Sequence, residues 1–430
     1  MKVFFEGIEY TEEQTKVINP RFAIHTERGT EIINYTGYYF NAKAKEHVYV
    51  LPKVFCFGKK AFGIAEPSEV VNWNNMHEIL KSNNWSSETI EELPIWIYRA
   101  IDVYNKRLQD NRITEEENYQ NIQSNRGNSE TTVAEITNNV RDLFKKNRDY
   151  FTYKLKIRKT GNDKVNWNKT ITRCTPHIEG QNIIYMNPYR KRREIDYEEE
   201  LLVLLYSTID YFNYKFGFHD KINAPFNLLT RQEYLVLLTT RRGVMTMQRL
   251  KNNYFNDRMK EIWNVLMVWF EKSCEVYSDD TYEEYLMCRN FNIVFEDMID
   301  DLIGDRAIPD ELQKQKDGKI IDHIFHYHSL VRQEEVYYIG DSKYYQLDEQ
   351  GLPRFGEQTL YKQFTYAKNV IQYNLDVLHG KVKEKEKDYE VNYRDELTEG
   401  YNITPNFFIT GSVSSTDTYF KDRLDVRTVN

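Results

Sequence analysis

The 430-residue sequence has few cysteines and no long apolar run. Its four cysteines (Cys56, Cys174, Cys274 and Cys288) are scattered, and no two have the close spacing of a zinc knuckle or a redox dithiol. No window approaches the roughly 18 consecutive apolar residues of a membrane helix, and residues 1–9 lack the basic-then-apolar profile of a secretion signal. We therefore expect reduced, structural cysteines in a soluble cytoplasmic protein that does not enter a membrane.

Positive charge is also scarce. The chain has 58 Lys and Arg against 66 Asp and Glu, which gives a net charge of −8. Proteins that hold DNA over a long face usually carry a positive excess, so any DNA contact is expected to be local or supplied partly by a partner. The sequence also lacks a Gly-x-x-x-x-Gly-Lys loop, a Gly-x-Gly-x-x-Gly loop after a strand and a nucleophile elbow around a serine. Any nucleotide hydrolysis would therefore belong to another polypeptide.

The length favours two or three domains. Residues 1–62 alternate short apolar and polar runs, which is typical of β-structure. A helix is expected over 93–108, with Pro94 in its first turn, where the missing N–H costs nothing. Residues 121–132 are rich in Asn, Ser, Gly and Gln and predict a linker or long loop. An N-terminal β-rich domain is thus expected over 1–120.

The rest of the chain has a mainly helical middle region and a C-terminal region of mixed pattern. In the middle region, 121–280, apolar residues at helical spacing predict helices over 198–216 and 247–274. An α-β-β-α-β series follows in 281–430: a helix over 282–303, strands over 320–328 and 336–345, a helix over 359–377 and a strand over 406–410. The expected fold class is α+β, ending in an α/β domain.

Charged residues interrupt the two expected C-terminal strands. Asp341 and Lys343 lie two apart in an apolar and aromatic strand, so they should share a face. Asp322 begins the preceding strand, which a turn would bring alongside. Mg²⁺ prefers oxygen ligands from one or two carboxylates, so Asp322 and Asp341 are the expected metal ligands. Lys343 would orient or help deprotonate an attacking water and stabilise charge on phosphoryl oxygens. The alternative is an exposed ion pair that contributes little to stability.

Two further polar residues lie on the flanking helices. Glu296 adjoins the apolar face of the first helix and would reach the metal or its water; alternatively it is one solvated acid among several. Gln363 on the second helix would hydrogen-bond the water or a phosphate, although a surface glutamine on an amphipathic helix is equally ordinary. We include both in the expected catalytic set, and Glu296 also among the expected metal ligands.

Two other groups were weighed as binding residues. His326 and His328 lie an even number of residues from Asp322 on the same expected strand, so all three would share a face, which suggests zinc. Two imidazoles without a neighbouring cysteine are, however, an incomplete set of zinc ligands. A compact basic run is a second candidate, for DNA phosphates: Arg190, Lys191, Arg192 and Arg193. The alternative is that this run is a solvent-exposed segment leading into a helix, with its charge offset by the acidic residues that follow.

The ordered polar residues resemble the PD-(D/E)xK nuclease superfamily. The residues that carry this resemblance are Glu296, Asp322, the triplet Asp341, Ser342 and Lys343, and Gln363. The resemblance implies a restriction-endonuclease-like domain with a mixed central sheet, a Mg²⁺ cofactor and a double-stranded DNA substrate. The family core is α-β-β-β-α-β, and one of its strands has no obvious counterpart here. Ile321 stands where the family pattern has proline.

Shorter segments resemble McrC-like and LlaJI-type restriction proteins. These are the aromatic run 38–40 leading into 48–54, the Trp-x-x-Thr-Ile segment in 166–171, and the pair at 295–296. The resemblance implies the nuclease subunit of a restriction, or anti-phage defence, system, driven by a McrB-like AAA+ GTPase. The N-terminal region would then dock on the GTPase ring. Two alternatives stay open: a stand-alone repair or mobile-element nuclease, and an inactive DNA-binding or assembly protein.

Overall fold

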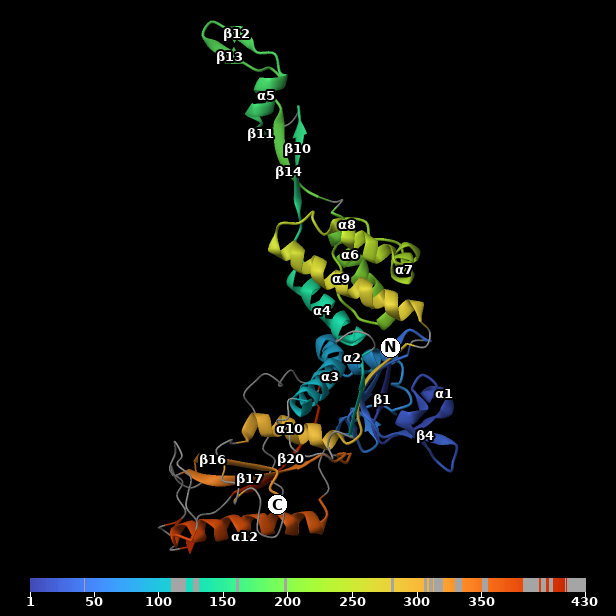
Figure 1. Cartoon of the computed structure of the whole chain (residues 1–430), viewed down its shortest axis with the longest axis vertical. Helices are drawn as coiled ribbons and strands as arrows, with labels where there is room; N and C mark the ends of the chain where they lie inside the picture. The colour runs from blue at the N-terminus through green and yellow to red at the C-terminus, as the bar shows by residue number, and fades with distance from the viewer. Residues whose placement is uncertain are drawn as a thin grey trace. The chain divides into compact units, whose positions relative to one another are not determined.

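The computed structural model describes the chain except residues 42, 110–120, 127–130, 160–161, 197–198, 280–281, 305–307, 309–311, 313–319, 329–334, 350–354, 382–393, 396–399, 402–404, 414 and 416–430. It is a mixed α and β protein that divides into two compact units (Figure 1). Unit 1 comprises Met1–Glu130 and Thr281–Asn430, and unit 2 comprises Thr131–Asp280. In the part of the chain described, no helix combines the length and apolar character needed to cross a membrane.

The first part of unit 1 is built on a five-stranded sheet in the order β1-β6-β5-β15-β9. Its elements are β1 (Lys2–Phe5), β2 (Glu9–Thr11), α1 (Glu12–Thr15), the 3-10 helix η1 (Pro20–Phe22), β3 (Ala23–His25), β4 (Thr30–Ile33), β5 (Thr36–Asn41), β6 (Glu46–Leu51), the 3-10 helix η2 (Lys53–Phe55), β7 (Cys56–Phe57), β8 (Lys60–Ala61), α2 (Trp73–Ser82), α3 (Ser87–Gln109) and β9 (Ile122–Asn125). The β-rich start expected from alternation is present. Helix α3 begins earlier than expected, so Pro94 lies inside it and not in its first turn.

The chain returns to this sheet after unit 2. Strand β15 (Glu283–Cys288) pairs antiparallel with both β5 and β9. A helix had been expected from residue 282, but Leu286, Met287 and Cys288 are fully buried between two strands, and pairing across the sheet overrides their local helical pattern. Residues 122–125, expected within a linker, form the edge strand β9. The regions 1–120 and 281–430, expected as separate domains, therefore share one sheet and one compact unit.

The last part of unit 1 contains a second sheet in the order β16-β17-β20. Its elements are α10 (Phe291–Ile303), β16 (His323–His328), β17 (Glu335–Lys343), α12 (Glu357–Leu378), β18 (Arg394–Asp395), β19 (Gly400–Tyr401) and β20 (Asn406–Thr410). Strand β17 pairs antiparallel with β16 and parallel with β20, so the sheet is mixed as expected. Helices α10 and α12 lie on opposite faces of this sheet (Figure 1). The resemblance to PD-(D/E)xK nucleases predicts one more strand, and most of the segment between α10 and β16 lies outside the described residues.

Unit 2 combines a group of packed helices with a β-ribbon. Its elements are α4 (Val133–Lys146), β10 (Tyr153–Arg158), β11 (Lys164–Val165), α5 (Trp167–Arg173), β12 (His177–Glu179), β13 (Asn182–Ile184), β14 (Arg190–Ile195), α6 (Glu200–Phe216), α7 (Arg231–Thr239), α8 (Arg242–Leu250) and α9 (Asp257–Ser278). The helix expected over 247–274 is split into two, because the Asn256 side chain caps a new helix by accepting a hydrogen bond from the Arg258 amide. Strands β10 and β14 lead away from the helices towards α5 and the β12–β13 hairpin (Figure 1).

Candidate active site

Strand β17 presents its odd-numbered residues to α12. Tyr337 and Ile339 belong to one core cluster with Tyr366 and Val370 of that helix. Because side chains two apart on a strand share a face, Asp341 extends this row beyond the apolar core. The α12 face of the sheet therefore changes from apolar to charged at its end.

Asp341 and Lys343 are in contact on this face. The Lys343 ammonium forms an ion pair with the Asp341 carboxylate, and the side chains are 12% and 1% exposed. The alternative of an exposed surface pair is inconsistent with this burial. Two charges so far removed from water need further polar partners, which a functional site would supply.

Asp322 immediately precedes β16 and lies opposite Asp341. His323 pairs with Gly340, so extending the antiparallel register by one residue brings Asp322 level with Asp341. The Asp322 Oδ2 accepts a hydrogen bond of 3.2 Å from the Ser342 amide. Burial first, then the Asp341 carboxylate and a hydrogen bond with it, raise the pKa of Asp322. Two buried carboxylates this close repel each other, and a divalent cation would relieve that repulsion.

Helix α12 brings Lys362 to the same place, and the next residue, Gln363, is buried on that helix. Within the described part of the chain, neither the buried amide group of Gln363 nor Asp341 Oδ1 has a hydrogen-bond partner. Lys362 Nζ lies 4.0 Å from that Asp341 oxygen, and its side chain is 44% exposed. Burial alone would lower the pKa of Lys362, but Tyr366, Asp322 and Asp341 raise it overall. Unpaired buried polar atoms beside two carboxylates fit a site that binds an additional group.

Glu296 interacts with Asp322 but comes from a different helix and a different face of the sheet than Lys362. It lies on α10, on the other face of the sheet from Asp341. Among the described residues, Glu296, Asp322 and Asp341 do not form a group whose ligand atoms all lie within 4.8 Å of one another. Its pKa is nevertheless raised to about 7, mainly by burial and next by the Asp322 carboxylate. Lys343 acts in the opposite direction. This environment suits proton exchange near neutral pH better than direct metal ligation alongside Asp341.

Two residues in this region were not singled out from the sequence. Lys362 is one, and its position next to Gln363 was the available signal. The other is His323, whose buried ring bonds Ser342 Oγ through Nε2 at 2.6 Å and approaches Asp300 of α10 through Nδ1 at 3.5 Å. His323 thus connects α10 to the residue between Asp341 and Lys343. Its position directly after Asp322 was the signal.

The other predicted binding residues lie elsewhere. His326 and His328 lie opposite Tyr337 and Glu335, progressively farther along β16 from Asp322, and neither belongs to a three-ligand group among the described residues. The basic run does not lead into a helix but forms most of strand β14 in unit 2. The structure therefore brings together Asp322, Asp341 and Lys343, with Lys362 of α12 close to Asp341. Gln363 is buried on α12 next to Lys362 in the sequence. The two histidines lie farther along β16, and the basic run belongs to unit 2.

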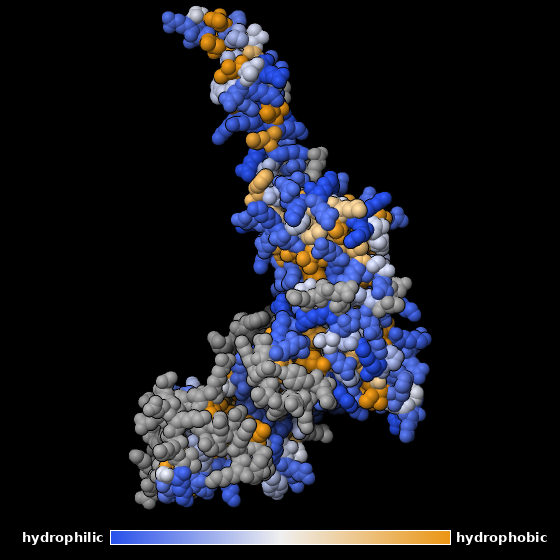
Figure 2. Space-filling view, viewed as in Figure 1, coloured by the Kyte–Doolittle hydropathy of each residue, from blue (hydrophilic) through white to orange (hydrophobic). Residues whose placement is uncertain are grey.

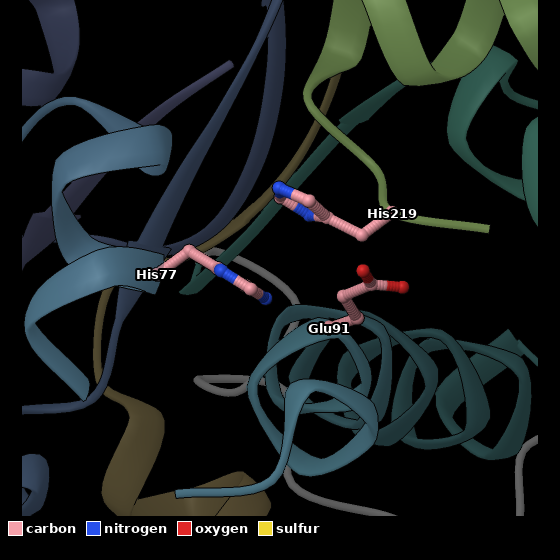
Figure 3. Close-up of side chains that lie close together, drawn as sticks. All are labelled: His77, Glu91 and His219. Atoms are coloured by element: carbon pink, nitrogen blue, oxygen red, sulfur yellow. The ribbon is translucent and has the colours of Figure 1, made fainter. Parts of the chain in front are cut away.

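Unit 1 also contains a buried histidine near a buried acid. His77 on α2 and Glu91 on α3 lie close together, with a ring nitrogen and a carboxylate oxygen within 4.8 Å (Figure 3). His219, also drawn there, belongs to unit 2. Two ligands from unit 1 are fewer than the three or four protein ligands of a zinc site, and we assign no metal to this pair.

Comparison of the chain with protein-family models, curated proteins and solved structures finds no match.

Proposed function

We propose that this protein is a metal-dependent deoxyribonuclease that hydrolyses phosphodiester bonds in double-stranded DNA. The observation that carries the proposal is the pair of buried carboxylates, Asp322 and Asp341. Lys343 contacts Asp341, and the other Asp341 oxygen has no hydrogen-bond partner among the described residues. Assembling such groups without water is costly unless a bound cation and substrate complete their interactions. This arrangement supports the proposed resemblance to PD-(D/E)xK nucleases.

The donor set fits Mg²⁺. Asp322 and Asp341 offer carboxylate oxygens, which hard divalent cations prefer, and there is no cysteine or second histidine of the kind that zinc favours among the residues gathered here. Asp322 and Asp341 would hold the ion, which when bound would supply Lewis acidity towards a phosphate oxygen. We retain Glu296 as a residue acting near the site, through Asp322.

The chain's own residues would divide the remaining tasks. Lys343, fixed by Asp341, would orient the attacking water and stabilise negative charge that develops on the phosphoryl group. Among the described residues the Gln363 amide has no hydrogen-bond partner, so its donor and acceptor would hydrogen-bond that water or a phosphate oxygen. Lys362 is the more exposed cation and would meet the approaching DNA backbone.

We further propose, from the resemblance to McrC-like and LlaJI-type proteins, that the chain is the nuclease subunit of a cytoplasmic restriction system. A McrB-like AAA+ GTPase would then perform the nucleotide hydrolysis for which this sequence lacks a phosphate loop. The N-terminal sheet would be the docking region for that partner. A stand-alone repair or mobile-element nuclease is the competing function, and an inactive DNA-binding or assembly protein is a third.

A plasmid-cleavage assay with Mg²⁺ distinguishes these functions. The chain is assayed alone, and then with the protein encoded by the neighbouring gene and GTP. Cleavage that requires both additions supports the restriction subunit, whereas cleavage by the chain alone supports the stand-alone nuclease. Absence of cleavage under all conditions, with DNA binding retained, supports the inactive protein. In either active case, Asp341→Asn should abolish cutting.

A further inference from the structure

Unit 2 contains a concentrated positive charge in an acidic protein. Residues 151–196 include eleven Lys and Arg but only four Asp and Glu, a net charge of +7 in a chain of net charge −8. Most of these cations lie on the antiparallel pair β10 and β14, which we call the basic ribbon, or beside it. The composition of the whole chain conceals this local excess.

The pairing of the basic ribbon places like charges opposite each other. Lys156 lies opposite Arg192, and Arg158 lies opposite Arg190. Residues in register share a face, as do residues two apart, so these four cations line one face together. On the other face Lys191 lies opposite Lys164 of β11. Like charges directly opposite each other destabilise a sheet, so this pattern opposes folding of the ribbon by itself.

The acids of the ribbon offset only part of this charge. Glu194 pairs with Arg158 at 3.0 Å and with Lys156 at 3.6 Å, and Asp196 pairs with Lys154 at 3.0 Å. Lys191 and Arg192 are exposed and form no ion pair with another described residue. The unbalanced cations therefore face solvent and are available to an anionic partner.

Aromatic rings are interleaved with these cations. The Arg193 guanidinium lies 4.5 Å from the Tyr153 ring centre, and the ammonium groups of Lys159 and Lys169 each lie 5.1 Å from the Tyr189 ring centre. Figure 2 shows hydrophilic and hydrophobic side chains in close alternation along this part of unit 2. Cation–π contacts keep these positive charges at the surface, and the aromatic rings beside them offer apolar surface to sugars and bases.

We propose that the basic ribbon binds the phosphate backbone of double-stranded DNA. Phosphates are closely spaced along a duplex, so they can neutralise several cations of one face at once. A two-stranded ribbon also fits the dimensions of the major groove. The proposal deepens the proposed nuclease function, on which it rests for the identity of the polyanion, by naming a surface in unit 2 that binds the substrate. An acidic surface of a partner protein is the competing occupant.

The test measures binding without catalysis. A fluorescently labelled 30-base-pair duplex is titrated with the full chain in EDTA, and the fluorescence anisotropy is followed at several salt concentrations. The ribbon variant combines Lys156→Ala, Lys191→Ala and Arg192→Ala. The control variant combines Lys145→Ala, Lys146→Ala and Lys260→Ala, which removes the same charge from exposed positions on α4 and α9 of the same unit.

We expect the ribbon variant to bind at least tenfold more weakly at low salt. Each lost phosphate contact lowers the slope of log affinity against log salt by about 0.9, so the slope should fall by about 2 to 3. The control should bind like the unaltered protein, and melting curves should show both variants folded. Equal DNA binding by the ribbon and control variants would overturn the proposal. It would also be overturned if the ribbon variant kept its DNA affinity but no longer associated with an acidic partner protein.

The outcome is separable from that of the nuclease proposal. Binding that depends on the ribbon, together with no cleavage under any condition, would support the ribbon while refuting the nuclease. Cleavage that depends on Asp341, together with binding that is indifferent to the ribbon, would do the reverse.

Discussion

The ammonium group of Lys343 contacts the carboxylate of Asp341, two residues earlier on the same strand, and both side chains are largely shielded from water. The contact neutralises one oxygen of Asp341 and leaves the other without a hydrogen-bond partner among the described residues. Lys362 Nζ, from helix α12, lies 4.0 Å from that second oxygen. Asp341 is thus the residue at which strand and helix contributions to the site meet.

Replacing Asp341 by asparagine should abolish cleavage with little loss of stability. The substitution keeps the side-chain shape and removes the charge that would hold a divalent cation, so metal affinity should fall. Loss of the attraction to Lys343 and relief of the repulsion from Asp322 act in opposite directions on folding. We expect at least a thousandfold lower Mg²⁺-dependent cleavage and a change in unfolding free energy of about 1 kcal/mol or less. Asp322→Asn should behave alike; near-normal cutting by either folded variant would refute the metal-ligand assignment.

Replacing Lys343 by alanine should reduce turnover and also stability. The ligands would remain, but the cation beside the attacking water would be lost, so kcat should fall by about a thousandfold while KM for DNA changes little. Asp341 would lose its main partner in a buried position, which should cost about 3 kcal/mol of unfolding free energy. Steady-state kinetics and denaturant titration measure the two effects. A variant that is destabilised but cleaves at the normal rate would leave Lys343 with a structural role alone.

Replacing Lys362 by alanine should weaken substrate binding more than turnover. Lys362 is exposed enough to meet the DNA backbone and remains charged beside Asp322 and Asp341. We expect about a tenfold increase in KM, substantially restored by Lys362→Arg, because a phosphate contact requires positive charge. Lys368→Ala, an exposed lysine on the same helix, is the matched control. An equal effect of both alanine substitutions would point to a general charge effect.

The pH dependence of stability should report on Glu296. Its pKa is about 7 in the folded chain and in the usual acidic range when unfolded, so the folded state binds more protons between pH 4.5 and 7. This contribution is fully present below the unfolded pKa and is lost as pH rises through about 7. Glu296→Gln should therefore resemble the unaltered protein at pH 4 and exceed its stability at pH 8 by about 3 kcal/mol at most.

Denaturant titrations of the two proteins in EDTA across this range provide the measurement. Parallel stability curves for the variant and the unaltered protein would show that Glu296 does not titrate in this way. A control with Asp301→Asn removes another carboxylate from the same helix, so the difference between this variant and Glu296→Gln isolates the contribution of Glu296.

Several elements of unit 1 could be predicted because their local patterns are strong. Helix α10, strands β16 and β17, helix α12 and strand β20 lie within a few residues of their expected bounds, apart from the start of α10. Strand β15 could not, because 282–288 contains residues that also suit a helix. Backbone pairing with β5 and β9 decides its conformation, and β5 lies more than 200 residues away in the sequence.

The sequence by itself determined that Asp341 and Lys343 share a face, because a strand repeats every two residues. It also determined the order in which the polar residues follow one another. Long-range packing alone decided that Asp322 lies level with Asp341, that Lys362 reaches Asp341 from α12, and that Glu296 lies across the sheet on α10. The physical reason is that the register of a strand pair and the face on which a helix packs depend on contacts between distant segments, which no local periodicity encodes.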